Sequence, residues 1–216
     1  MERNVGIESS SSRQLKDLIQ ELMLENSQPI PASAARTIAL QMLQERGRGA
    51  VLVGVARVDA ALEHLLQALM APAPSRGDGL FLPDRPLGSL GAKVALARRL
   101  GLIDVPVERA LSALRKLRNA FAHSAESASL ADPAHGARLA EIYAEARANP
   151  LWAPLETVLA AQPPSSHGPL EPALRDYILL ITIMVAFLEA TAQQLRPYQP
   201  PVVMGFSGVV RQDSAG

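Results

Sequence analysis

Arg118, Asn119 and His123 are the side chains of this sequence whose types and spacing best suit chemistry. Asn119 and His123 are four residues apart, so on a helix their side chains can meet. The ordinary pKa of histidine lies close to neutrality, so His123 could remove a proton from a ribose 2′-hydroxyl while Arg118 or Arg115 neutralises the phosphate. This chemistry needs no metal ion, but it needs a second proton-transfer group or a second copy of the cluster across a two-fold axis. Without further information, the same spacing also fits a solvated polar helix face.

The residues around this cluster predict an amphipathic helix from Val105 to His123. At 100° per residue, four apolar residues fall within a narrow arc that forms the expected core stripe: Ala110, Leu114, Leu117 and Phe121. Arg118 sits at the edge of this stripe, whereas Ser112, Arg115, Asn119 and His123 fall on the opposite side. We therefore expect His123 to face water, another helix or another subunit.

The charge of the chain sums to zero, with 21 basic and 21 acidic side chains, but it is unevenly distributed. Residues 88–123 carry a net charge of +5 and residues 124–195 a net charge of −5. The candidates for anion or nucleic-acid binding in the basic segment are Lys93, Arg98, Arg99, Arg115 and Lys116. Two interpretations stay open: the basic and acidic helices neutralise each other when they pack, or the basic segment forms a local surface for an anion or nucleic acid.

The composition excludes several classes of protein. The absence of cysteine rules out a disulfide-stapled scaffold, thiolate zinc sites and a catalytic thiol. Hydrophobic residues make up 48% of the chain and charged residues 19%, which is not the composition of a disordered chain. His64, His135 and His167 lack metal-ligand spacing, and no glycine-rich nucleotide-binding motif occurs, so we expect neither a metal nor a cofactor.

We expect an all-α bundle of about seven or eight helices in a single domain. The expected division is a flexible N-terminus over residues 1–11, the helical domain over residues 12–196, and a C-terminal tail over residues 197–216 that is loose or pairs locally. Helices are predicted over residues 12–25, 33–46, 50–70, 105–123, 132–148 and 171–195, with short ones after Ser89 and after Pro150. Those at 50–70, 105–123 and 171–195 should form the centre.

The most apolar stretch, residues 177–188, should be the most buried segment. It is shorter than the roughly 20 residues that a membrane-spanning helix needs. The first residues also lack the apolar stretch of a secretory signal, so we expect a cytoplasmic protein with no membrane contact.

Three blocks of the sequence resemble a known family. The blocks Pro86–Lys93, Ala97–Ile103 and Leu114–His123 resemble the mannitol operon repressor family of bacterial helical proteins. The Arg-Asn-x3-His ending of the last block is also similar to the Arg-x4–6-His signature of the HEPN superfamily. The first resemblance implies an all-α regulator without a recognisable helix-turn-helix. The second implies a helical bundle, commonly dimeric, that is either a metal-independent endoribonuclease or a non-catalytic nucleotide- or RNA-binding module.

The HEPN resemblance nominates Arg118, Asn119 and His123, because the motif arginine and histidine of two subunits line a shared cleft in those enzymes. Three hypotheses follow: a regulator acting through protein or nucleic-acid contacts, a metal-independent endoribonuclease, and a purely structural dimerising bundle. The expected partners are a second copy of the chain and either RNA or a regulatory protein.

Overall fold

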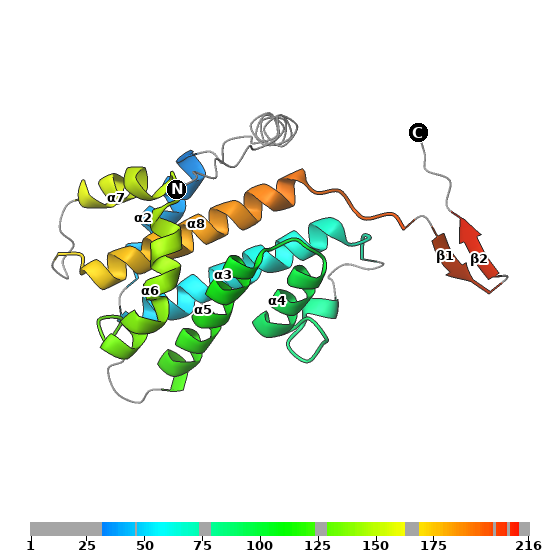
Figure 1. Cartoon of the computed structure of the whole chain (residues 1–216), viewed down its shortest axis with the longest axis horizontal. Coiled ribbons are helices and arrows are strands. Elements are labelled where there is room, and N and C mark those ends of the chain that lie inside the picture. Colours follow the sequence, from blue (N-terminus) through cyan, green and yellow to red (C-terminus); the bar gives the residue numbers. More distant parts are fainter. Residues whose placement is uncertain are drawn as a thin grey trace, which may run out of the picture.

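The computed structural model describes residues 32–45, 47–73, 79–123, 129–162, 169–200, 202–206 and 208–211. In these ranges the chain is an all-α bundle followed by a small hairpin (Figure 1). The α-helices are α2 (Ala32–Met42), α3 (Gly47–Leu69), α4 (Leu90–Arg99), α5 (Val105–His123), α6 (Pro133–Arg147), α7 (Trp152–Ala160) and α8 (Pro172–Gln194). A 3-10 turn, η1 (Gly79–Phe81), precedes α4. The expected helix over residues 12–25 and flexible segment over residues 1–11 lie outside the described residues.

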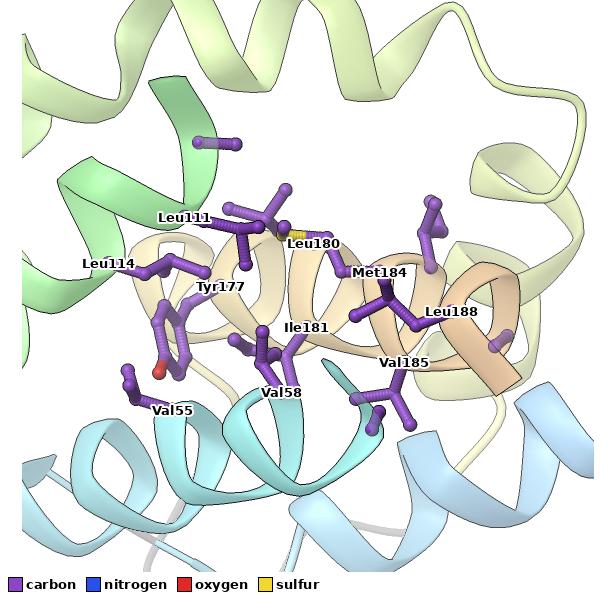
Figure 2. Close-up of a cluster of buried hydrophobic side chains, with 14 of the residues drawn as sticks. Val55, Val58, Leu111, Leu114, Tyr177, Leu180, Ile181, Met184, Val185 and Leu188 are labelled. Carbon is purple, nitrogen blue, oxygen red and sulfur yellow. The ribbon is translucent and has the colours of Figure 1, made fainter. Parts of the chain in front are cut away.

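The core lies where α3, α5 and α8 meet, as the apolar patterns predicted. Figure 2 shows Val55 and Val58 of α3 facing Tyr177 and Ile181 of α8 across the cluster. Residues 177–188 are buried apart from Phe187, of which 43% is exposed. Burial of this helix on nearly all sides stabilises the fold, because each large apolar side chain removed from water contributes about 2 kcal/mol.

Gly54 of α3 allows α3 and α8 to approach closely. A Cβ atom at this position would lie 2.6 Å from Tyr177 Oη and 3.1 Å from Ile181 Cγ1. Tyr177 Oη donates a 3.0 Å hydrogen bond to the carbonyl oxygen of Val51, which satisfies the buried hydroxyl. Burial raises the pKa of Tyr177 well above its usual value. The small residue at 54 is therefore required by the helix contact.

Local signals in the sequence fix both ends of α4. Ser89 is its N-cap, and the Ser89 Oγ accepts a hydrogen bond from the amide of Ala92. Gly101 follows the C-cap with a φ of 71°, a conformation that glycine adopts without strain. The next helix, α5, begins where the Asp104 carboxylate accepts a hydrogen bond from the amide of Val107. The start of α4 lies against the middle of α5, where Gly91 meets Arg115.

The C-terminal tail pairs locally. Strands β1 (Val202–Gly205) and β2 (Gly208–Arg211) form an antiparallel hairpin that stands apart from the helices in Figure 1. The amide of Tyr198 donates a 2.7 Å hydrogen bond to Leu69 at the end of α3, which ties the segment before the hairpin to the bundle. Among the described residues, no helix combines the length and the apolar content needed to cross a membrane.

Candidate functional site

A groove with a volume of about 570 Å³ opens between α3, the start of α4 and α5. Its α5 wall carries Arg115, Arg118 and Asn119, three of the residues that the sequence singled out. The other lining residues come from all three helices: Leu52, Val55, Ala56 and Asp59 of α3, Gly88, Ser89, Leu90 and Gly91 at the start of α4, and Ala122 of α5. The wall is therefore basic on one side and largely apolar on another.

Arg115 and Arg118 form the basic side of this groove. Both side chains are exposed, and neither makes a hydrogen bond or ion pair with any described residue. Atoms of the Arg115 side chain lie 3.5–3.8 Å from where a Cβ atom of Gly91 would be. The Arg115 guanidinium therefore lies against the first turn of α4, at ordinary contact distance from Gly91.

His123 is exposed at the C-terminal end of α5 and does not line the groove. His123 comes five positions after Arg118, which turns the two side chains about 140° apart around the helix axis. Asn119 lies only about 40° from His123 in this projection. Within one chain, the structure therefore brings together Arg115, Arg118 and Asn119 and leaves His123 outside.

Arg48, which the sequence did not single out, contacts the C-terminal turn of α5, next to His123. Its Nη2 donates a 2.8 Å hydrogen bond to the carbonyl oxygen of Ala122, which lies in the last turn of α5. A cation is favourable at the end of a helix, where carbonyl groups lack partners inside the helix. The two residues are 74 positions apart, so no local pattern in the sequence could have paired them.

Lys93 is not part of an exposed basic surface, which corrects the expectation that it binds an anion. Only 3% of the residue is exposed, and its Nζ lies 2.9 Å from Asp59 Oδ1 and 2.7 Å from Glu63 Oε2 of α3. Burial alone would lower the pKa of Lys93, but the two carboxylates more than offset this, so its pKa is raised. The expectation fails because the ammonium group of Lys93 is already paired with the Asp59 and Glu63 carboxylates of the same chain. These two ion pairs join α4 to α3.

Arg98 is also paired, whereas the other basic candidates are not. Arg98 Nε lies 3.3 Å from Glu108 Oε2, which joins α4 to α5 at the surface. Arg99, Lys116 and the additional cation Arg109 are exposed and make no hydrogen bond or ion pair within the described ranges. Within α4 and α5, the exposed cations without a described partner are thus Arg99, Arg109, Arg115, Lys116 and Arg118.

The ion pairs do not join the basic segment to the acidic one. Asp176 of α8 is nearly buried and pairs with Arg147 and Arg175, and Arg175 also pairs with Glu156. These pairs lie within the acidic segment, while Lys93 pairs with α3. In the part of the chain that the structure describes, no ion pair links residues 88–123 to residues 124–195. Direct contacts therefore leave the +5 segment largely unneutralised.

A second groove of about 570 Å³ lies beside α8 and the α4–α5 connection. Most of its lining is apolar, including Ile183, Met184 and Phe187, and Arg98 lies at its edge. Across the described ranges, no group of three His, Asp or Glu side chains is arranged to hold a metal ion.

The fold and the first groove define an all-α bundle with a basic groove wall. A scan against protein-family models, a search of curated proteins and a search of solved structures found no match.

Proposed function

We propose that this protein is a regulator of the mannitol-operon-repressor kind that acts by binding nucleic acid, with RNA as its main ligand, through the basic side of α5. The supporting observation is the group of five exposed cations on α4 and α5 that have no carboxylate partner among the described residues. Phosphate groups are the natural counter-ions for such a surface, since each neutralised phosphate releases a condensed cation. The resemblance of residues 86–123 to the repressor family adds the regulatory role.

The outer face of α5 is the part of this surface best placed for an extended polyanion. At 100° per residue, Arg109, Lys116 and His123 project to the side of α5 away from the groove, within about 40° of one another. All three are exposed. A nucleic-acid backbone lying along α5 can reach Arg109 and Lys116 together without entering the groove.

The double variant Arg109→Ala/Lys116→Ala is expected to bind single-stranded RNA about tenfold more weakly at moderate salt. The dependence of log affinity on log salt should fall by about 1.4, because two phosphate contacts are lost and each contributes about 0.7 for a single strand. Fluorescence anisotropy of a labelled RNA over a range of salt concentrations measures both quantities.

Arg138→Ala is the matched control for this experiment. Arg138 is an exposed arginine of α6, in the acidic segment, and its removal changes the net charge without touching α5. An unchanged salt dependence in the double variant, or no RNA binding by the wild type, would exclude the proposed surface. Binding to a protein instead of RNA would then become the mode of regulation to test.

The second candidate function is a metal-independent endoribonuclease. The observation that favours it is the exposure of Arg118, Asn119 and His123 on adjacent turns of α5. Since His123 lies outside the groove of its own chain, a complete site needs a second copy of the protein that brings another His123 towards Arg118. The homodimer is thus part of this candidate function.

If the protein is a nuclease, we expect it to cleave structured RNA in the presence of a chelator. His123→Ala, which removes the general base, and Arg118→Ala, which removes the charge that neutralises the phosphate, should each slow cleavage about 100-fold. Arg138→Ala should retain the wild-type rate. Gel analysis of the products, with sedimentation to establish the dimer, provides the measurement. Equal cleavage by wild type and both variants, or no cleavage by the wild type, would exclude the nuclease. The non-catalytic regulator would then be the one remaining candidate function of the two.

A further inference from the structure

We infer that the groove between α3, α4 and α5 is a binding site for a terminal phosphate group, a phosphomonoester, held by Arg115 and Arg118. This goes beyond the proposed function, because it uses the groove face of α5 rather than the outer face. The phosphate can belong to a small molecule or to the end of an oligonucleotide, and its chemistry is the same in both.

The two arginines present an excess of positive charge at one place. Arg115 and Arg118 are three residues apart on α5, so their side chains are neighbours, and like charges at this spacing repel each other. Neither has an anionic partner among the described residues. The one carboxylate in the groove wall, Asp59, already accepts a 2.9 Å hydrogen bond from Lys93. A bound anion would relieve the repulsion that no described residue relieves.

The charge and geometry of the pair favour a phosphomonoester. A phosphomonoester carries about −1.5 to −2 charges at neutral pH, which matches two guanidinium groups, whereas an internal phosphodiester carries one. Guanidinium groups bind phosphate oxygens with paired N–H donors. Asn119, in the same wall, offers a side-chain amide as a further donor. The start of α4 lines this groove too, but the two arginines provide the charge.

The other lining residues of the groove restrict the kind of chemical group to which the bound phosphate can be attached. No aromatic side chain is among the lining residues, so a base has no stacking platform of the kind used by proteins that bind single strands. Leu52, Val55 and Ala56 provide an apolar surface opposite the arginines. A terminal phosphate can enter a recess of this size end-on, while a phosphate joined on both sides enters only if its strand bends. Recognition thus centres on the phosphate.

Isothermal titration with inorganic phosphate and with ribose 5-phosphate tests the site directly. We expect Arg115→Ala and Arg118→Ala each to weaken binding at least tenfold, and Arg138→Ala to leave it within twofold. Arg115→Lys should recover only part of the loss, because it keeps the charge but not the paired donors. Urea unfolding of each variant confirms that the fold is intact.

Two further measurements identify the source of the phosphate and can overturn the inference. A 5′-phosphorylated oligonucleotide that binds at least tenfold more tightly than its 5′-hydroxyl form, with the difference lost in Arg118→Ala, supports a nucleic-acid end as the source. Equal binding of the two forms alongside binding of ribose 5-phosphate supports a small molecule. No binding of any phosphate, or equal weakening by Arg109→Ala/Lys116→Ala, overturns the groove site, and the latter result leaves the proposed function in place.

Discussion

Gly54→Leu is expected to lower the free energy of unfolding by about 4 kcal/mol, as for severe overpacking of a core. The first atom of any side chain at this position would already lie 2.6 Å from Tyr177 Oη and 3.1 Å from Ile181 Cγ1. To make room, α3 and α8 must separate, and the buried hydrogen bond from Tyr177 to Val51 is lost as well. Gly54→Ala should cost about 2 kcal/mol by the same mechanism, despite the better helix propensity of alanine. Urea unfolding followed by circular dichroism gives these values.

Gly136 provides the matched control, since it is also a glycine inside a helix, α6. No atom lies within 4 Å of the position that its Cβ would occupy. Gly136→Ala and Gly136→Leu should therefore leave stability unchanged or raise it by up to about 1 kcal/mol. Tyr177→Phe removes the hydroxyl that Gly54→Ala would meet first, so the double variant should lose less than the sum of the two single variants. Equal effects at positions 54 and 136 would show that the close approach of α3 and α8 is unimportant.

The all-α fold was predictable because the helices carry the apolar period of 3.6 residues that core packing requires. Predicted and observed bounds agree for α5, and α4 begins directly after Ser89, as predicted. The start of α3 was placed wrongly: the helix was predicted to begin at residue 50, yet α3 begins at Gly47 and includes Gly49. Low helix propensity was overridden there by the packing of the following residues, a tertiary effect that no local pattern contains.

The positions of the candidate site residues were predictable from the sequence only within the single helix α5. Helical spacing placed Arg115 and Asn119 away from the core, and both are exposed. The same spacing did not indicate that Arg118 joins them in a groove while His123 stays outside it. That outcome depends on where α3 and the start of α4 pack along α5. Contacts between helices that are distant in sequence cannot be derived from the period of either helix.

Lys93 is the clearest case, because residue type alone suggested an anion-binding cation. Its partners Asp59 and Glu63 are four residues apart on α3 and thus share one face of that helix. The pair was visible in the sequence, but the packing of α4 onto that face was not. The ammonium also lies 5.8 Å from the centre of the Phe81 ring, where a cation–π attraction adds to its binding. The charge of Lys93 therefore acts in stability and not in ligand binding.

Lys93→Met is expected to lower the free energy of unfolding by about 3 kcal/mol. Methionine retains most of the buried hydrocarbon volume, so the loss comes mainly from Asp59 and Glu63, which would face each other without a cation. Removing one partner of a buried ion pair costs about 3–5 kcal/mol, and the lower end applies because about a third of each carboxylate side chain stays in contact with water. Urea unfolding, followed by the fluorescence of the buried Trp152, measures the change.

Arg98→Met is the matched control, since Arg98 is another cation of α4 with a carboxylate partner. Its pair with Glu108 is about 40% exposed on both sides, so its loss should cost no more than about 0.5 kcal/mol. Adding Asp59→Asn and Glu63→Gln to Lys93→Met should restore much of the stability, because the repulsion disappears with the charges. Equal losses in Lys93→Met and Arg98→Met, or no recovery in the triple variant, would contradict the assignment.

The pH dependence of the wild type provides an independent test of the same ion pairs. The pKa of Lys93 is raised above its usual 10.5, so folding favours the protonated ammonium. The stability that this preference contributes is fully present below pH 10.5 and is lost as the pH rises through the raised pKa. The difference in unfolding free energy between wild type and Lys93→Met should accordingly shrink above that pH. A difference that stays constant as the pH rises through 10.5 and above would mean that Lys93 stabilises the fold through its hydrocarbon chain and not through its charge.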